Sequence, residues 1–316
     1  MGGHSDEALA GSLSGITVRA ITQPLDVLKI RFQLQVEKIS STNGGYYQSM
    51  YQALHRISRE EGLVGLWKGH VPGQLLSVVF VSSEFYFFHK FSELSLHYLH
   101  SLSSISTDLV CGSGAGLVSS VICQPLDVFR TRLAGQGSKK VYRGIFHGVG
   151  CIFREEGLLA FWRGLVPAFL LIVPQTALSF GIYEGVKRAL KPGKSSTSDS
   201  HDLGPWLSFP TPLVGALAGC ISKSAVYPLD VVKKRFQIVG FEEARRPFGK
   251  LPNVKTATPY NFKTGFVLIQ LWHTEGFLGL FKGWRPSMLK AGVSTGATFT
   301  FFELYKALIS EVVLRK

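Results

Sequence analysis

A six-residue block occurs three times in this chain, about a hundred residues apart. The copies begin at Pro24, Pro125 and Pro228 and read PLDVLK, PLDVFR and PLDVVK, and the prolines are 101 and 103 residues apart. Recurrence at a fixed period is the signature of a repeated structural unit. The 316 residues therefore hold three copies of one unit and little else.

A second shared block lies farther along each copy. It consists of a Glu-Gly pair, four variable residues, and then an aromatic residue, a cation and a glycine. The three blocks are Glu61-Gly62 with Trp67-Lys68-Gly69, Glu156-Gly157 with Trp162-Arg163-Gly164, and Glu275-Gly276 with Phe281-Lys282-Gly283. We predict repeats at 1–100, 101–200 and 201–316 that together form one structural domain.

Each copy contains two apolar segments around a polar middle. The segments 71–83, 109–126, 165–183 and 291–302 carry no charge, and a span of roughly 20 apolar residues is what a bilayer core requires. Between the paired spans, stretches such as 46–61 mix charged and apolar residues at helical spacing, which is typical of interfacial helices. We predict an all-α membrane protein of six transmembrane helices, in three pseudo-symmetric repeats around a central cavity, with short amphipathic matrix helices and kinks at the prolines.

Pairs of glycines four residues apart precede each proline at the same offset. They are Gly11 and Gly15, Gly112 and Gly116, and Gly215 and Gly219. Small residues at this spacing let helix backbones approach closely in a bilayer. We therefore expect close helix packing at each pair.

The charge balance points to an anionic partner. The chain has 34 Lys and Arg against 21 Asp and Glu, a net charge of +13, while 46% of its residues are hydrophobic. Arg19, Lys223 and Lys290 each stand inside an otherwise apolar stretch and not on a basic polar face, which disfavours nucleic-acid binding. The partner predicted is a small anionic metabolite, together with the lipid bilayer.

Signals of catalysis are missing from the sequence. The four cysteines form no CxxC pattern, which argues against a zinc cluster or a disulfide framework. Glycine-rich phosphate loops and nucleophile–base patterns are missing too, so we expect no enzyme, no catalytic residue, no metal and no cofactor. A soluble helical-repeat scaffold is a distant alternative, but its repeats usually run 20–50 residues.

Two further stretches carry expectations of their own. Residues 1–7 contain acids and no basic, apolar leader pattern, so any membrane address is expected to be internal. Residues 191–208 have the composition of a flexible linker.

The proline and Glu-Gly blocks in triplicate resemble the mitochondrial carrier family, and the resemblance covers essentially the whole chain. It implies a multi-pass protein of the mitochondrial inner membrane with both termini facing the intermembrane space. It also implies transport by alternating access through two gates. Cardiolipin as a lipid partner and a functional monomer belong to the same expectation.

The resemblance also implies a matrix gate made by the proline blocks. Its ion pairs would join Asp26 to Arg130, Asp127 to Lys233, and Asp230 to Lys29. One helical turn after two of the cations stand Gln33 and Gln237, which would brace their pairs by a hydrogen bond. The remaining copy has Ala134 at that position.

The opposite, cytoplasmic gate implied by the family needs an acid and a base near the end of each second span. Two copies supply them, as Glu184 with Lys187 and Glu303 with Lys306. The first copy has residues 88–92, FHKFS, in which neither stands at its place. Only Glu184 with Lys306 forms a complete pair. We therefore expect a weak outer gate and a substrate-free protein resting open to the intermembrane space.

Substrate contacts are implied at two levels of the helices. Five residues before each motif proline stand Arg19, Ser120 and Lys223, and seven residues after each second-block glycine stand Leu76, Leu171 and Lys290. A cation inside a membrane span is costly and is usually functional. Glu84 is an additional inward-facing candidate by the family pattern. Neither Arg19 nor Lys223 has an acid at i±4, so a ligand is their expected partner.

A closer likeness points to the thiamine pyrophosphate carriers within this family. It is carried by residues 67–72, 240–245 with 248–249, 289–291 and 294–296. One bidentate Arg and two Lys suit the oxygens of a pyrophosphate. Glu84 could accept hydrogen bonds from an aminopyrimidine ring or offset the charge of a thiazolium ring. Alternatively, it could be a structural partner of Arg19 or Lys290. Exchange of thiamine pyrophosphate is thus the expected function, and a nucleotide or coenzyme A carrier of the same family is the alternative.

Overall fold

The computed structural model describes residues 2–37, 45–98, 104–138, 141–190, 210–241 and 264–314, and the regular secondary structure within these ranges is helical. The linker expected at 191–208 lies outside them. The long helices are α1 (Gly2–Leu34), α3 (His70–Tyr98), α4 (Ser104–Gly135), α6 (Leu165–Leu190), α7 (Pro210–Ala225) with α8 (Tyr227–Gln237), and α10 (Trp284–Leu314). The short helices are α2 (Met50–Glu61), α5 (Ile145–Glu156) and α9 (Thr264–Glu275). The all-α fold class is confirmed.

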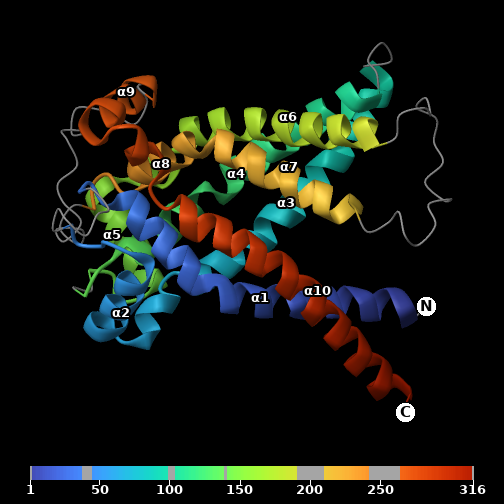
Figure 1. Ribbon diagram of the computed structural model, residues 1–316, viewed down its shortest axis with the longest axis horizontal. Coiled ribbons are helices and arrows are strands. Elements are labelled where there is room, and N and C mark those ends of the chain that lie inside the picture. The colour runs from blue at the N-terminus through green and yellow to red at the C-terminus, as the bar shows by residue number, and fades with distance from the viewer. Residues whose placement is uncertain are drawn as a thin grey trace.

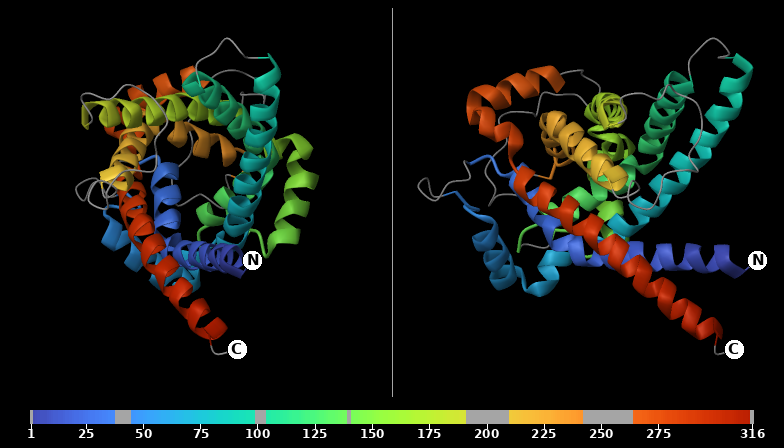
Figure 2. Two further views of the ribbon diagram at one scale, coloured as in Figure 1. Left: turned by 90° about the vertical axis from the view of Figure 1, so that its right-hand side faces the viewer. Right: turned by 45° about the vertical axis from the view of Figure 1, so that its right-hand side comes forward.

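The long helices form a ring that closes between the first copy and the third. α3 packs mainly on α4, α6 on α7, and α10 on α1, so each major contact joins one copy of the unit to the next. The short helices gather at one end of the molecule, here called the closed end (Figure 1). The chain termini lie at the other, open end, where α1 and α10 diverge from α3 and α4 (Figure 2).

The prolines act differently in the three copies. Pro24 and Pro125 lie inside the continuous helices α1 and α4, whereas the third copy breaks at Val226 and resumes as α8 with Pro228 near its start. Proline lacks an N–H and clashes with the preceding turn, so each of these positions interrupts the helical hydrogen-bond ladder. The break ends the apolar span of α7 just before its charged block.

The short helices α2 and α5 are amphipathic, as expected from 46–61, whereas α9 is apolar along most of its length. In α2, Ser49 caps the N-terminus by accepting a hydrogen bond from the Gln52 N–H over 3.2 Å, and Ala53 and Ile57 are buried. The helix ends at Gly62, whose φ of 75° lies in the left-handed region that favours glycine. A 3₁₀ turn, Leu63–Trp67, then leads into α3.

Three helices of the described ranges are long and apolar enough to cross a membrane, at 63–95, 107–135 and 158–183. The other long elements, α1, α7 with α8, and α10, hold the cations Arg19, Lys223 and Lys290, respectively. Charge lowers the mean hydropathy of a span without shortening it. The cations therefore weaken the membrane signal of these elements.

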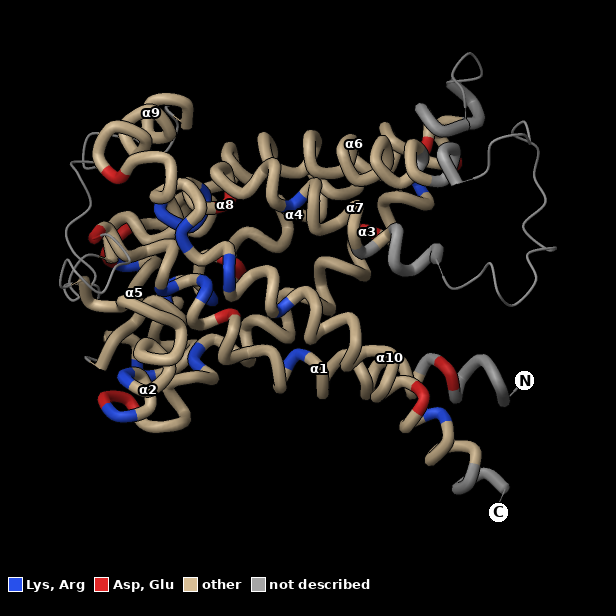
Figure 3. Tube along the Cα trace, viewed as in Figure 1, with Lys and Arg blue, Asp and Glu red and all other residues tan. Residues whose placement is uncertain are grey.

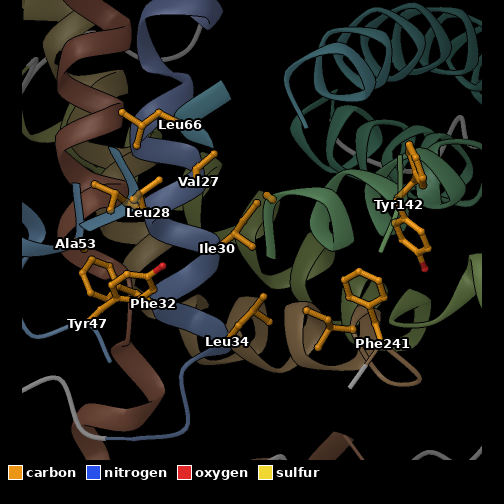
Figure 4. Packing of buried hydrophobic residues seen from close by; sticks show 14 of the residues in the cluster. Val27, Leu28, Ile30, Phe32, Leu34, Tyr47, Ala53, Leu66, Tyr142 and Phe241 are labelled. Atoms are coloured by element: carbon orange, nitrogen blue, oxygen red, sulfur yellow. The ribbon is translucent and has the colours of Figure 1, made fainter. Parts of the chain in front are cut away.

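The buried apolar core lies at the closed end. The side of α1 that bears Val27, Leu28 and Phe32 packs against Tyr47 and Ala53 (Figure 4). On the neighbouring copies the rings of Tyr142 and Phe241 stack with their centroids 4.7 Å apart. Away from this end, large apolar side chains such as Val78 and Phe85 on α3 are exposed, as expected of helices that face lipid.

The glycine pairs do not all mediate close packing, so that expectation is wrong for this conformation. A side chain added at Gly11, Gly15, Gly215 or Gly219 would meet nothing within 4 Å. Only Gly116 of the pairs is tightly packed, with Ile172 Cγ2 3.3 Å from its added Cβ position. These glycines lie towards the open end, where the helices diverge, so most of them have no neighbouring backbone to approach.

Candidate functional site

Three ion pairs link the proline blocks of neighbouring copies at the closed end. Each acid of a block pairs with the cation of the next copy instead of the cation of its own. The pairs are Arg130 with Asp26 (2.6 Å), Lys233 with Asp127 (2.9 Å) and Lys29 with Asp230 (2.6 Å). They join α1 to α4, α4 to α8 and α8 to α1, and Figure 3 shows the charged residues concentrated in this half of the molecule. We call these six residues the seal.

The seal is not symmetric. The Gln237 amide donates to Asp127 Oδ2 over 2.8 Å, and the Gln33 amide donates to Asp230 Oδ2 over 2.9 Å. Asp26 has no glutamine, because the matching position is Ala134. Its carboxylate instead accepts from Lys290 of α10, whose Nζ lies 2.7 Å from one oxygen and 2.8 Å from the other.

Lys234 is a member of this network that the sequence analysis missed. Its Nζ lies 2.8 Å from Asp127 Oδ1 and 3.0 Å from both Thr131 Oγ1 and Gln237 Oε1. Asp127 therefore receives two lysines and one amide. The signal was the Lys233-Lys234 pair of the third copy, since the other copies have Ile30 and Thr131 in place of the second lysine.

A second ring of charges lies around the seal and ties the short helices to the long ones. In the first copy, Arg31 donates two hydrogen bonds to the Glu61 carboxylate, over 2.5 and 2.7 Å, and Lys68 approaches the same carboxylate at 2.5 Å. Burial by itself raises the pKa of Glu61, but the hydrogen bonds and charges of Arg31 and Lys68 outweigh it and hold the pKa below the ordinary 4.5. The other copies repeat this arrangement, with Arg132, Glu156 and Arg163, and with Arg235, Glu275 and Lys282.

The arginines of this second ring also bind the next copy. Arg31 Nε donates to the Ala134 carbonyl over 3.0 Å, and Arg235 Nε donates to the Gln33 carbonyl over 3.0 Å. Arg132 Nε likewise reaches the Gln237 carbonyl over 3.1 Å. Because each recipient carbonyl lies in the last turn of its helix, these bonds satisfy acceptors that the helix leaves unpaired. The sequence analysis had not singled out these arginines, two residues after each seal cation.

Steric constraints explain why the second block of each copy ends in glycine. Gly69, Gly164 and Gly283 have φ of 78°, 83° and 81°. An added Cβ would lie 3.0 Å from the Arg130 carbonyl oxygen at Gly69, 3.0 Å from that of Lys233 at Gly164, and 2.8 Å from that of Lys29 at Gly283. Only glycine combines this backbone angle with this approach.

The three cations expected to bind substrate have different surroundings. Lys223 makes no hydrogen bond or ion pair with any residue that the structure describes, and its electrostatic neighbours are Lys29, Asp230 and Asp26. Arg19 donates to the Ser77 hydroxyl, so the expectation that only a ligand could partner it is wrong. A serine seven residues into α3 could not be matched with α1 from sequence spacing. Lys290 is bound to Asp26 as described above.

The remaining candidates are Glu84, Ser120, Leu76 and Leu171. Glu84 on α3 lies near Gly116 and makes no hydrogen bond or ion pair within the described ranges. Hence it is not a structural partner of Arg19 or Lys290 here. Ser120 is buried, and Leu76 and Leu171 are half-buried.

Of the candidate outer-gate residues, the structure describes the side chains of Glu303 and Lys306. Lys306 on α10 pairs with Glu7 on α1, Nζ to Oε1, at 3.0 Å, and Glu303 is exposed. The side chains of Glu184 and Lys187 lie outside the described residues. The expected Glu184–Lys306 pair therefore has one member held by a residue that the sequence analysis did not consider.

Comparison with known proteins follows the repeats. The family model of mitochondrial carrier proteins matches residues 3–99, 101–194 and 206–312. The mitochondrial thiamine pyrophosphate carrier of Homo sapiens is 38% identical over 301 residues, covering 94% of this chain and 90% of that protein. That of Bos taurus is 39% identical over 304 residues, with 94% and 91% covered, and mitochondrial thiamine diphosphate carrier 1 of Arabidopsis thaliana is 36% identical over 314 residues, with 94% and 92% covered.

These matches cover all three copies of the unit, and the ring of helices has the threefold arrangement that three such copies require. Three repeats of this family imply the fold of six transmembrane helices. The chain belongs to the mitochondrial carrier family, whose members are multi-pass transporters of the mitochondrial inner membrane.

Proposed function

We propose that this carrier exchanges thiamine pyrophosphate across the mitochondrial inner membrane by alternating access. Support comes from relatives in animals, fungi and plants that are named for this substrate, at 32–39% identity over most of the chain. As a mitochondrial carrier the protein is a transporter and not an enzyme. Its closed end would face the matrix and its termini the intermembrane space.

The observation that carries the proposal is the group of cations on the open side of the seal. Lys223 has no protein partner in the described ranges, Arg19 donates there to the neutral Ser77 hydroxyl and pairs with no acid, and Lys290 shares Asp26 with Arg130. Two of these cations stand inside membrane spans without a dedicated counter-charge, which is expensive unless a ligand supplies one. A pyrophosphate offers several oxygens to one guanidinium and two ammonium groups.

Glu84 supports a substrate that carries an amine or a cationic ring beside its phosphates. Its carboxylate is half-buried on α3 and has no partner among the described residues. A free carboxylate here would repel a purely anionic ligand but could accept hydrogen bonds from an aminopyrimidine. It thereby favours thiamine pyrophosphate over an inorganic anion. The contacts of Leu76, Leu171 and Ser120 complete the proposed site.

The three seal pairs, Asp26–Arg130, Asp127–Lys233 and Asp230–Lys29, would form the matrix gate. Ion pairs beside water are worth about 0.2–1 kcal/mol each, so the lock amounts to a few kcal/mol. A 1:99 population is reversed by about 5.5 kcal/mol of differential binding, which is within reach of a multiply charged ligand. The cytoplasmic gate would use Glu184 with Lys306, and Lys187 and Glu303 would lack a partner from the first copy.

The proposal includes a functional monomer with three repeats bounded near residues 100 and 200, in contact with lipid that includes cardiolipin. Its test is uptake of labelled thiamine pyrophosphate into liposomes that contain the purified carrier and a set of internal counter-substrates. We expect saturable uptake that depends on the internal substrate. Good exchange of nucleotides or coenzyme A without uptake of thiamine pyrophosphate would reject this substrate and favour the alternative.

A further inference from the structure

The seal aspartate of the first copy is held by two cations from different helices. Arg130 on α4 approaches Asp26 Oδ2 at 2.6 Å, and Lys290 on α10 approaches both oxygens at 2.7 and 2.8 Å. The Asp26 side chain is 7% exposed and that of Lys290 is 26% exposed. Lys290 therefore reaches a buried carboxylate while part of its own chain stays accessible.

Lys290 replaces the brace that the other two seal pairs have. Asp127 and Asp230 each accept a hydrogen bond from a glutamine amide of the seal helices. At Asp26 the extra donor comes instead from a helix outside the seal. If Lys290 left, Asp26 would keep Arg130 alone, and this pair would become the only one of the three without a second donor.

Positive charge is in excess around Asp26. The guanidinium groups of Arg19 and Arg130 both lie against Gly73, whose added Cβ would be 3.2 Å from Arg19 Nη2 and 3.1 Å from Arg130 Nε. The buried Nε–H donors of both arginines have no acceptor within the described part of the chain. Asp26 thus pairs with two cations, Arg130 and Lys290, while Arg19 lies beside Arg130 without an acid of its own among the described residues, and donors remain for a second anion.

We propose that Lys290 changes partners during transport, clamping Asp26 when the carrier is empty and binding a substrate phosphate when it is loaded. This inference rests on the proposed function, because it needs a substrate with phosphate oxygens. A pyrophosphate carries more negative charge than one carboxylate, so it competes well for the ammonium group. Departure of Lys290 then leaves Asp26–Arg130 as the weakest seal pair. The seal opens first between α1 and α4.

The test compares three alanine variants by thermal unfolding of the purified carrier, without ligand, with thiamine pyrophosphate and with inorganic pyrophosphate. Gln33→Ala removes a brace from Asp230 and touches no candidate substrate contact, so it lowers Tm and keeps the ligand-induced rise. Lys223→Ala removes a cation that has no described protein partner, so it keeps the ligand-free Tm and loses most of the rise. Lys290→Ala should lower the ligand-free Tm and also lose most of the ligand-induced rise.

Either half of the Lys290 result can overturn the partner change. A ligand-free Tm equal to that of the unmodified carrier would show that Lys290 does not clamp Asp26. A full ligand-induced rise of Tm in Lys290→Ala would show that the Lys290 ammonium group does not bind the substrate phosphate. If the variant is too unstable to purify, Lys290→Met keeps a side chain of similar length without the charge. Its ligand-free Tm and its ligand-induced rise are then judged in the same way.

The two pyrophosphate probes separate this inference from the proposed function. If thiamine pyrophosphate fails to raise Tm of the unmodified carrier while inorganic pyrophosphate succeeds, the substrate assignment fails and the partner change is still judged with the second probe. If neither probe raises Tm of the unmodified carrier, phosphate does not bind at these cations, and the partner change is rejected as well.

Discussion

The Gln237 amide donates to Asp127 Oδ2 over 2.8 Å. The second copy has no matching glutamine to donate an amide hydrogen bond to Asp26, because Ala134 stands at that position. Gln33 makes the equivalent bond to Asp230. The three pairs of the seal are therefore built differently although their acids and cations repeat. Several measurable consequences depend on this difference.

Restoring the missing brace should strengthen the seal. The new side chain of Ala134→Gln should fit, because the equivalent glutamines already pass beside second-block glycines. Gln33 Cγ lies 3.2 Å from an added Cβ at Gly283, and Gln237 Cγ lies 3.1 Å from one at Gly164. A net gain of about 1 kcal/mol per hydrogen bond predicts a higher Tm and exchange slowed about fivefold. Tm and initial exchange rates in liposomes measure both.

Ala134→Met is the matched control for this prediction, because it adds a chain of similar length without an amide. If Met raises Tm as much as Gln does, filling space and not the hydrogen bond to Asp26 explains the effect.

The second ring of charges should dominate stability at the closed end. Glu61→Gln leaves the buried guanidinium of Arg31 and the ammonium of Lys68 without a carboxylate, and breaking a buried pair of this kind costs about 3–5 kcal/mol. We expect a large fall in Tm. The neighbouring change Glu60→Gln removes a surface pair with Arg56 and should cost about 0.2–1 kcal/mol. Equal losses in the two variants would contradict the buried role of Glu61.

Acid should destabilise the same region. The folded pKa of Glu61 lies below the ordinary 4.5, so its stabilising effect is fully present above about pH 4.5 and is lost as the pH falls through the folded pKa. The Tm difference between the unmodified protein and Glu61→Gln is therefore constant near neutral pH and shrinks in acid. Thermal unfolding from pH 7 downwards measures it, and a difference that grows in acid would refute the assignment.

The open end should respond to Glu7. Its pair with Lys306 ties α1 to α10 and occupies the cation of the proposed Glu184–Lys306 pair. Glu7→Gln frees Lys306 for Glu184, which predicts a modest shift towards a state closed to the intermembrane space, since surface pairs are weak. Accessibility of single engineered thiols at the open end measures the shift.

A matched surface change sets the baseline for the Glu7 experiment. Glu93→Gln removes the exposed pair with Lys90 within α3, which does not bridge two helices. It should leave accessibility unchanged. If both variants behave alike, the bond between α1 and α10 has no part in holding the open end.

The fold class was predictable from the sequence because the repeats impose it. Two apolar spans per copy, three copies, and interfacial stretches such as 46–61 define which segments are helices and how many there are. The family resemblance also implied which residues of the seal would pair, and the structure contains those contacts, while their action as a gate stays a prediction. The glycine pairs failed as a packing prediction because the helices diverge where most of them lie.

Partner choice across helices was not predictable in the same way. Lys290 was expected to contact the substrate, and in the structure it forms an ion pair with Asp26. Lys234 was not predicted as a member of the seal network, and it forms an ion pair with Asp127. Lysine and arginine side chains reach several ångströms from their backbones. Sequence spacing therefore predicts the face of the helix that carries the side chain but not the acid with which it pairs.

What the sequence alone determined is the periodic part of this protein: the helices, their threefold order, and the acids and cations that every copy repeats. What only the tertiary structure decided is the asymmetric part, namely the clamp of Lys290 on Asp26, the second lysine at Asp127 and the tie of Glu7 to Lys306. The reason is physical. Periodicity is encoded in local spacing, whereas an ion pair between helices depends on their tilt and separation, which packing of the whole ring sets.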